Sequence, residues 1–432
     1  MTQTEIGLVG LAILSAMLLI GLDVGFSMLV TGFFGFALIG GWGAALGNMA
    51  ILPFDTLNSY FFAVLPLFIL MGNFVFSSGM GGETYTMARA WLGQFKGGLA
   101  IATIGGSALF GAISGSSLAG SLVMGKVAYP EMRKAGYKMR LAAGCVSVGG
   151  TLDLLIPPSM AFVFIGILTD LNIGQLLIAG IVPGILVTLF YMATIAVWCK
   201  FDPELAPSTV KPTWKERRDS LKLTWPALLL FLLVMGGMYA GYFTATEAGA
   251  VGAFGALVIP LLRRQMTRQA FWGSLMDCAR MTSMIIILLV GAYMFSAFLA
   301  ITQIPNDFGG FLVGLPVGKW GVMVAIVIFY IVAGTFFDPY SLLILTIPIF
   351  YPAIQALGFD LIWWSVIMVR LLEIGNISPP AGINLFGLKG VIDAPISEIY
   401  KGVIPFLISD VFSMALLMAF PIISTWLAYM MI

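Results

Sequence analysis

Long apolar segments recur along this chain of 432 residues, separated by short stretches that carry most of its charge. About ten of them approach the roughly 20 residues that an α-helix needs to cross a bilayer. They are residues 6–22, 26–48, 57–79, 138–170, 174–199, 224–243, 247–262, 280–303, 360–390 and 405–430. The N-terminus has no basic region before its apolar run, so the first segment is predicted to be a retained helix. The pattern predicts an all-α polytopic membrane protein.

Two further apolar regions, residues 98–125 and 319–355, are interrupted in their middles. The first contains the sequence SGSS at residues 114–117, and the second contains FFDPYS at residues 336–341. Non-helical backbone at membrane depth is tolerated only where protein or water satisfies its polar groups. Each region is therefore predicted to form a re-entrant helical hairpin.

Basic residues gather in five connecting stretches, which the positive-inside rule assigns to the cytoplasm. These are residues 89–96, 126–140, 200–222, 263–280 and 389–401. Threading the spans between them places both termini on the periplasmic side. Within these stretches, residues 214–222 and 267–275 have the pattern of short amphipathic helices lying on the cytoplasmic surface.

The two halves of the chain, residues 1–200 and 223–432, repeat one order of elements across a cytoplasmic linker at residues 201–222. Three spans precede a hairpin, and a span broken by a proline pair follows it, at Pro157-Pro158 and at Pro379-Pro380. Each half has an odd number of full spans, so the second half starts from the opposite face. This order predicts an inverted-topology repeat.

Composition narrows the functional classes. Hydrophobic residues make up 60% of the chain and charged residues 9%, compared with about 25% charged residues in soluble domains. The net charge of +1 gives no reason to expect nucleic acid binding, and the absence of histidine removes Ser-His and Cys-His catalysis. The three cysteines show no metal-binding or disulfide spacing and are predicted to be packing residues. We therefore expect a transporter in the lipid bilayer and not an enzyme.

The two proline pairs suggest where the chemistry lies. Proline removes an amide hydrogen and displaces the carbonyl four residues before it, so each pair frees backbone carbonyls. Free carbonyls and hydroxyls are hard oxygen ligands suited to sodium, and the half-helix beyond each break can receive a carboxylate at its N-terminus. Close helix packing by small residues and a simple kinked helix are the structural alternatives.

Ionisable residues within predicted membrane segments are costly, and each is a functional candidate. The candidates are Asp153, Glu247, Asp338, Arg370, Glu373 and Asp410. Arg370 and Glu373 are three residues apart, which allows an ion pair on one helix and favours a structural role for both. Asp153 lies inside the first break, where it would either favour a cation or repel a second anionic group.

Four motifs together resemble one known family. They are FGAISGSSLAGSLVMG, LLIPPSM, TATEAGAVGA and EIGNISPPAGINLF. In this order they resemble the large, DctM-type membrane subunit of tripartite ATP-independent periplasmic (TRAP) transporters, and the resemblance covers essentially the whole chain. It implies an elevator-type symporter of the bacterial inner membrane, driven by about two or more sodium ions. A periplasmic binding protein of the DctP type would deliver the solute, and a small four-helix subunit of the DctQ type would accompany the chain.

The resemblance also implies a site. Substrate contacts are expected at Ser116, Ser117, Asp153, Pro157, Asp338, Asn376 and Pro379. Sodium ligands are expected at Ser114, Gly150, Ile156, Thr335, Gly375 and Ser378. The solute would carry a carboxylate, as a dicarboxylate, a sugar acid such as sialic acid or a related compound does. Two positions depart from the family pattern: Ala245 replaces a usual proline, and Asp153 replaces a frequent glycine, which leaves the solute open.

Three other functions remain to be compared with this one. An elevator-type ion-coupled carboxylate carrier could work without a binding protein. An intramembrane hydrolase would need a lysine partner for a serine of SGSS, and Lys126 lies at a basic edge instead of beside the tip. A passive channel would not require a sodium gradient.

Overall fold

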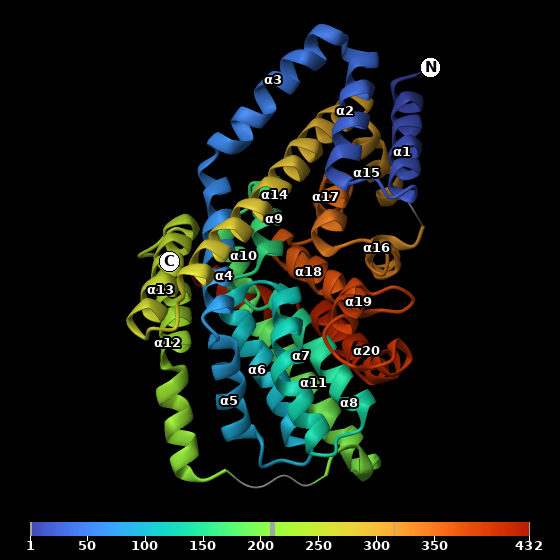
Figure 1. Cartoon of the computed structure of the whole chain (residues 1–432). Helices are drawn as coiled ribbons and strands as arrows, with labels where there is room; N and C mark the ends of the chain where they lie inside the picture. The colour runs from blue at the N-terminus through green and yellow to red at the C-terminus, as the bar shows by residue number, and fades with distance from the viewer. Residues whose placement is uncertain (1, 208–211, 315, 432) are drawn as a thin grey trace.

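The computed structural model describes residues 2–207, 212–314 and 316–431, and every regular element in these ranges is a helix (Figure 1). The first half contains α1 (Gln3–Leu19), α2 (Val24–Gly40), α3 (Trp42–Asn58), η1 (Tyr60–Ala63), α4 (Val64–Ser77), α5 (Met80–Leu92), α6 (Gly98–Ser114), α7 (Ser117–Lys134), α8 (Met139–Thr151), η2 (Leu152–Leu154), α9 (Met160–Thr169), α10 (Ile173–Ala179), α11 (Ile181–Phe201) and η3 (Pro203–Leu205). The second half contains α12 (Trp214–Tyr239), α13 (Ala245–Leu262), α14 (Arg268–Thr302), α15 (Ile304–Gly314), α16 (Gly318–Gly334), α17 (Pro339–Ala356), α18 (Leu361–Ile377), α19 (Ile383–Lys389), α20 (Ile396–Ala419) and α21 (Ile422–Tyr429).

Seven helical segments in the described part of the chain are long and apolar enough to cross a membrane. They are Tyr60–Ser77, Ile173–Phe201, Trp214–Tyr239, Ala245–Leu262, Arg268–Thr302, Pro339–Ala356 and Ile396–Ala419. Shorter apolar helices, among them α1, α2, α6 and α16, accompany them. The chain is thus an all-α, multi-pass membrane protein, as its hydrophobic pattern predicts.

Several element boundaries differ from the prediction. The apolar segment 26–48 is not one helix, because Gly41 adopts a left-handed φ of 87° and separates α2 from α3. Helices α5 and α15 were not predicted, since neither forms a long apolar run. Residues 214–222 and 267–275 do not form separate surface helices; each stretch continues without a break into the span of α12 or α14.

Four helices form an outer frame, which we define as α2, α4, α13 and α14. Helix α2 packs along α14, and α13 packs along α4, so each pair joins the two halves of the chain. Glycine permits this approach: a Cβ atom on Gly32 would lie 2.6 Å from the backbone nitrogen of Phe295. On the other pair, a Cβ atom on Gly252 would lie 2.5 Å from the Met71 sulfur.

The interrupted helices differ in burial. Hairpin 1 consists of α6 and α7, and hairpin 2 consists of α16 and α17. The helices of hairpin 1 and of the two breaks lie mostly in the interior, whereas α16 of hairpin 2 is largely exposed. Nearly every residue of α6, α8, α9 and α18 is buried, whereas only Ala45 and Thr56 are buried in α3. In Figure 1, hairpin 1, α8 and α18–α20 lie together in the lower centre, while α12 and α13 stand to the left and α14 crosses diagonally above.

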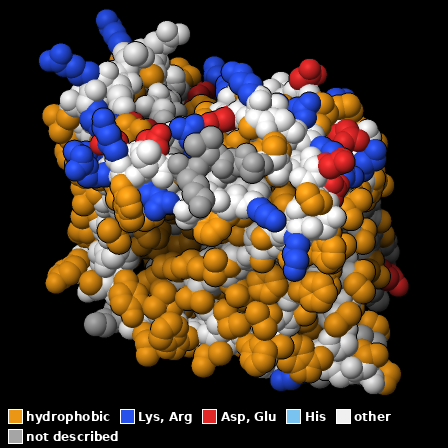
Figure 2. Space-filling model, turned by 90° about the horizontal axis from the view of Figure 1, so that it is seen from below, with side chains coloured by type: hydrophobic (Ala, Val, Ile, Leu, Met, Phe, Trp, Pro, Cys, Tyr) orange, Lys and Arg blue, Asp and Glu red, His pale blue; other side chains and the backbone are white. Residues whose placement is uncertain are grey.

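Three of the basic stretches meet on one side of the molecule. Lys138 bonds to Glu204 at 2.8 Å and Arg140 to Asp202 at 2.6 Å, which ties the start of α8 to the end of α11. The guanidinium of Arg217 lies 5.7 Å from the centre of the Trp91 ring, which brings the start of α12 against α5. Figure 2 shows basic side chains gathered along one side of the face in view, next to a broad apolar band.

Candidate functional site

The tip of hairpin 1 is a sharp reversal between α6, which is almost wholly buried, and α7, which is partly buried. Helix α6 ends at Ser114, and Gly115 takes a left-handed φ of 66° that lets the chain turn back. Ser116 then caps α7 by accepting a hydrogen bond from the Ala119 amide at 3.5 Å. A Cβ atom on Gly115 would lie 2.6 Å from the Pro158 carbonyl oxygen, so the tip rests against the first break, residues 152–159.

The first break contains a fully buried carboxylate. Asp153 is 0% exposed, and its Oδ2 accepts a hydrogen bond from the Ser114 hydroxyl at 3.2 Å. Its Oδ1 has no hydrogen-bond partner. Two glycines crowd the carboxylate, since Cβ atoms on Gly111 and Gly120 would lie 2.3 Å and 2.5 Å from its oxygens. The break and the tip of hairpin 1 therefore enclose a carboxylate oxygen that remains available as a ligand.

Hairpin 2 and the second break, residues 378–382, meet in a similar way. Asp338 caps α17, accepting hydrogen bonds from the Tyr340 amide at 3.0 Å and the Ser341 amide at 3.2 Å. The Thr335 carbonyl accepts a hydrogen bond from the Gly382 amide at 3.1 Å. Each hairpin tip thus contacts the break of its own half, and both breaks contain a cis Pro-Pro bond.

Both tips open onto one cavity of about 120 Å³ that also borders the outer frame. Its polar side contains the N-terminal ends of three helices: Ser116 at α7, Met160 at α9, and Asp338 and Ser341 at α17. Its outer-frame side is formed by α4 and by the middle of α14, from Met281 to Leu288. Helix N-termini carry partial positive charge, so an anion in this cavity would be stabilised without a basic side chain.

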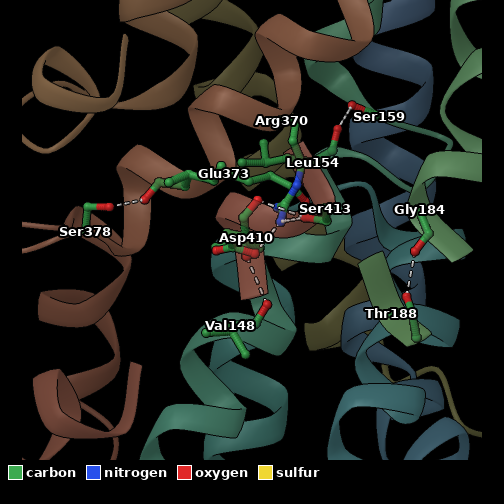
Figure 3. Close-up of polar contacts among 12 residues, drawn as sticks. Val148, Leu154, Ser159, Gly184, Thr188, Arg370, Glu373, Ser378, Asp410 and Ser413 are labelled. Carbon is green, nitrogen blue, oxygen red and sulfur yellow. Dashed lines mark hydrogen bonds and ion pairs between the residues drawn. The ribbon is translucent and has the colours of Figure 1, made fainter. Parts of the chain in front are cut away.

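A buried ion cluster fixes α18 to α20 (Figure 3). Arg370 donates to Glu373 at 2.7 Å, to the Ser413 hydroxyl at 3.2 Å and to Asp410. The three charged side chains are 0% exposed, and Arg370 also lies 5.8 Å from the centre of the Tyr191 ring. The Arg370–Glu373 pair expected from their spacing is therefore present, with a second carboxylate, that of Asp410, on the same guanidinium.

Comparison with known proteins decides the family. The family model described as "Tripartite ATP-independent periplasmic transporter, DctM component" matches residues 11–423. The chain belongs to this family. This DctM component is 33% identical over 381 residues to the C4-dicarboxylate TRAP transporter large permease protein DctM of Pseudomonas aeruginosa, across 88% of this chain and 87% of that protein.

Two further proteins bear on this DctM component. It is 30% identical over 452 residues to the isethionate TRAP transporter permease protein DctMQ of Oleidesulfovibrio alaskensis, across 98% of this chain and 68% of that protein. The crystal structure of the YdaH transporter of Alcanivorax borkumensis superimposes with a TM-score of 0.55, at 15% identity and over 87% of this chain and 88% of that one. The second likeness establishes a shared fold. The family and the transporter class expected from the motifs are thereby confirmed.

The predicted substrate residues of the DctM component do not all lie at the cavity. Ser116 and Asp338 line it, and Ser117 follows directly at the start of α7. Asp153 and Pro157 are buried in the first break, and Asn376 is buried at the end of α18. Pro379 is exposed. The structure therefore brings one predicted substrate residue from each hairpin tip to the cavity, where the predicted sodium ligand Ser114 also lies.

The predicted sodium ligands of the DctM component fall into two groups, one at each break. Ser114 is buried beside Asp153; Ile156 lies in the first break, and Gly150 packs against the Ser121 side chain. At the second break, Thr335 donates to the Val332 carbonyl at 2.9 Å and Ser378 to the Ile374 carbonyl at 2.6 Å. Gly375 packs against Gly334. Both hydroxyls keep lone pairs free to bind a cation.

Two amide residues of the site were not predicted from the sequence. Asn384 joins three helices: its Nδ2 donates to the Ser147 carbonyl at 3.0 Å, its Oδ1 accepts from Ser121 at 2.9 Å, and its backbone amide donates to Asn376 at 3.2 Å. Asn73 lines the cavity from α4. In both cases an amide side chain interrupts an apolar run, and this signal could have identified them.

Proposed function

We propose that this DctM component imports a small carboxylate-bearing solute together with sodium, and that the cavity between the hairpin tips and the outer frame is the transport site. The convergence of three helix N-termini, at Ser116, Met160 and Asp338, carries this proposal. Partial positive charge at each N-terminus would offset the charge of one carboxylate.

The first break supports a sodium site. Asp153 and Ser114 supply the hard oxygen ligands that such a cation prefers. The Oδ1 atom of Asp153 has no hydrogen-bond partner that would offset its negative charge. A bound sodium ion would supply the missing positive charge and couple its gradient to uptake. Thr335 and Ser378 would provide hydroxyl oxygens for a second ion at the second break.

The position of the cavity supports an elevator mechanism. It lies where the hairpins meet α4 and α14, so movement of the hairpins past the outer frame would carry a bound solute with them. The inverted order of elements in the two halves gives such a carrier two related entrances. In this arrangement the protein lies in the bacterial inner membrane with both termini in the periplasm.

The partners follow from the family. We propose a periplasmic binding protein that delivers the solute and a small four-helix membrane subunit. The isethionate relative supports the second partner, because its name joins the M and Q components and this chain covers 68% of it. The alternative is an elevator-type carrier without a binding protein. That alternative would be favoured if the membrane subunits alone took up the solute as fast as they do when the periplasmic protein is added.

The transport site is tested by Ser116→Ala and Asp338→Asn in liposomes containing the complete transporter. Ser116→Ala removes the hydroxyl that caps α7, and Asp338→Asn removes the charge and one of the two acceptor oxygens that cap α17. Either change should disturb its hairpin tip, so sodium-driven uptake should fall by about tenfold or more. Ser15→Ala, at an exposed position of α1, is the matched control and should retain uptake. Normal uptake in both tip variants would show that the cavity is not the transport site.

A further inference from the structure

The two sides of the cavity differ in chemistry. The polar side holds the helix N-termini described above, whereas the side formed by the outer frame is lined by apolar residues such as Ile69, Met281, Met284 and Leu288. Among the described residues that line this second side, Asn73 has the only polar side chain. A solute spanning the cavity would therefore meet backbone amides at one end and a mostly apolar surface at the other.

Charge within the cavity limits the solute further. None of the described lining residues is a lysine or an arginine, and Asp338 is the one carboxylate among them, beside the phenol of Tyr340. The Asp338 carboxylate already accepts two backbone hydrogen bonds as the cap of α17. A carboxylate can be held by the helix N-termini, but a second one would lie against Met281 and Leu288 without a partner. Burying an unpaired charge of this kind is strongly unfavourable.

Asn73 has a fixed orientation. Its Nδ2 donates to the Ser274 carbonyl at 3.3 Å, and the Ser274 hydroxyl donates to the Asn73 carbonyl at 3.3 Å. Ser77 shares a further hydrogen bond of 2.9 Å with the Ser274 hydroxyl. Because the amide nitrogen is directed to α14, the amide oxygen Oδ1 is left to accept a hydrogen bond from the solute. A hydroxyl group fits this position, and an ionised carboxylate, which cannot donate, does not.

The size of the cavity agrees with a small ligand. Its volume of about 120 Å³ is well below the roughly 300–1,000 Å³ of pockets that hold drug-sized molecules. A sugar acid with many hydroxyl groups would need more space and more polar partners than α4 and α14 offer.

From these observations we propose that the solute is a small monocarboxylate with an apolar carbon body and one hydroxyl group. Its carboxylate would bind at the N-termini of α7 and α9, away from the Asp338 carboxylate that already caps α17. Its body would contact α14, and its hydroxyl would donate to Asn73. This inference rests on the proposed function, because it names the class of solute for the same cavity. It excludes C4-dicarboxylates as the preferred solutes.

Binding to the full-length protein in lipid nanodiscs tests the proposal. Four probes are compared by titration calorimetry at saturating sodium: 2-hydroxybutyrate, butyrate, succinate and malate. We expect 2-hydroxybutyrate to bind about tenfold or more tightly than succinate or malate. Asn73→Leu should abolish the advantage of 2-hydroxybutyrate over butyrate while butyrate still binds. Asn73→Ser, which keeps a hydroxyl and disturbs the contact with α14 less, should preserve part of that advantage.

A gain-of-function variant gives the converse test. Met284→Arg places a cation on the α14 side of the cavity and should strengthen succinate binding relative to butyrate. Met276→Arg lies on the same helix outside the cavity lining and should leave the ratio unchanged. Sodium-dependent binding of succinate as tight as that of 2-hydroxybutyrate would overturn the inference and leave the proposed function intact. Absence of binding by all four probes would also overturn the inference, whereas the proposed function is tested separately by uptake in the Ser116→Ala and Asp338→Asn variants.

Discussion

Among the described residues, three acids, Asp153, Glu373 and Asp410, have no exposed surface, and one base, Arg370, is buried with them. Arg370 satisfies two of them directly, whereas Asp153 has only the Ser114 hydroxyl. A buried carboxylate is strongly destabilised unless it is paired, protonated or bound to a cation. At the scale of residues, Asp153 is therefore the group that most needs an external partner.

Replacement of this carboxylate tests its role in ion coupling. Asp153→Asn keeps the shape of the side chain and removes its charge, so the sodium concentration giving half-maximal uptake should rise by about tenfold or more. The measurement is uptake against sodium concentration in liposomes. Asp55→Asn, exposed on α3, is the control and should leave the curve unchanged. An unaltered curve for Asp153→Asn would exclude the carboxylate as a sodium ligand.

The Arg370 cluster has a structural role in this account. Arg370→Ala would leave Glu373 and Asp410 buried without a cation, which should reduce the free energy of unfolding by about 3–5 kcal/mol. Thermal unfolding in detergent measures the effect. Lys401→Ala breaks an exposed pair with Glu398 and should change the melting temperature little. Equal melting temperatures for the two variants would contradict a structural role.

Single residues were predictable where local spacing fixes their contacts. The pairing of Arg370 with Glu373 follows from their separation of three on a helix. Asp410 joins them from 40 residues away, and Asn384 meets Ser121 from 263 residues away. Contacts of this kind depend on how helices from the two halves pack, and no local pattern indicates them.

At the scale of elements, helix α4 sets how closely the outer frame approaches hairpin 1. A Cβ atom on Gly72 would lie 2.3 Å from the carbonyl oxygen of Ser114, so any larger residue must push the tip away. Gly72→Ala should therefore lower the initial rate of uptake, with an overpacking cost of roughly 1–3 kcal/mol. Gly82→Ala, where the added methyl group meets open space, should transport normally. Equal rates in the two variants would show that this contact does not matter for transport.

Interrupted elements were predictable because their causes are local. Glycine, serine and proline specify the tip at residues 114–117 and the two breaks without reference to the rest of the fold. Continuous elements were harder to delimit. The polar start of α14 runs into its apolar span as one helix of 35 residues, because nothing in its sequence ends the helix between them.

At the scale of the whole molecule, the order of elements was readable from the sequence, but their convergence was not. Spacing alone places the tips of hairpins 1 and 2 more than 200 residues apart in the chain. Packing between helices of the two halves, including α9 on α17 and α4 on α14, brings both tips to one cavity. For the same reason, the exposure of Pro379 could not be derived from its motif, and an amide in an apolar run marks Asn73 as a candidate without placing it at the cavity.

Sodium dependence of uptake tests the central claim most directly. The protein is reconstituted in liposomes with its small membrane subunit and periplasmic binding protein, and uptake of the delivered solute is followed with an inward sodium gradient. Replacement of external sodium by potassium should abolish accumulation, because the oxygen ligands at the two breaks would lack their coupling ion. Accumulation that continues unchanged in potassium would contradict the account.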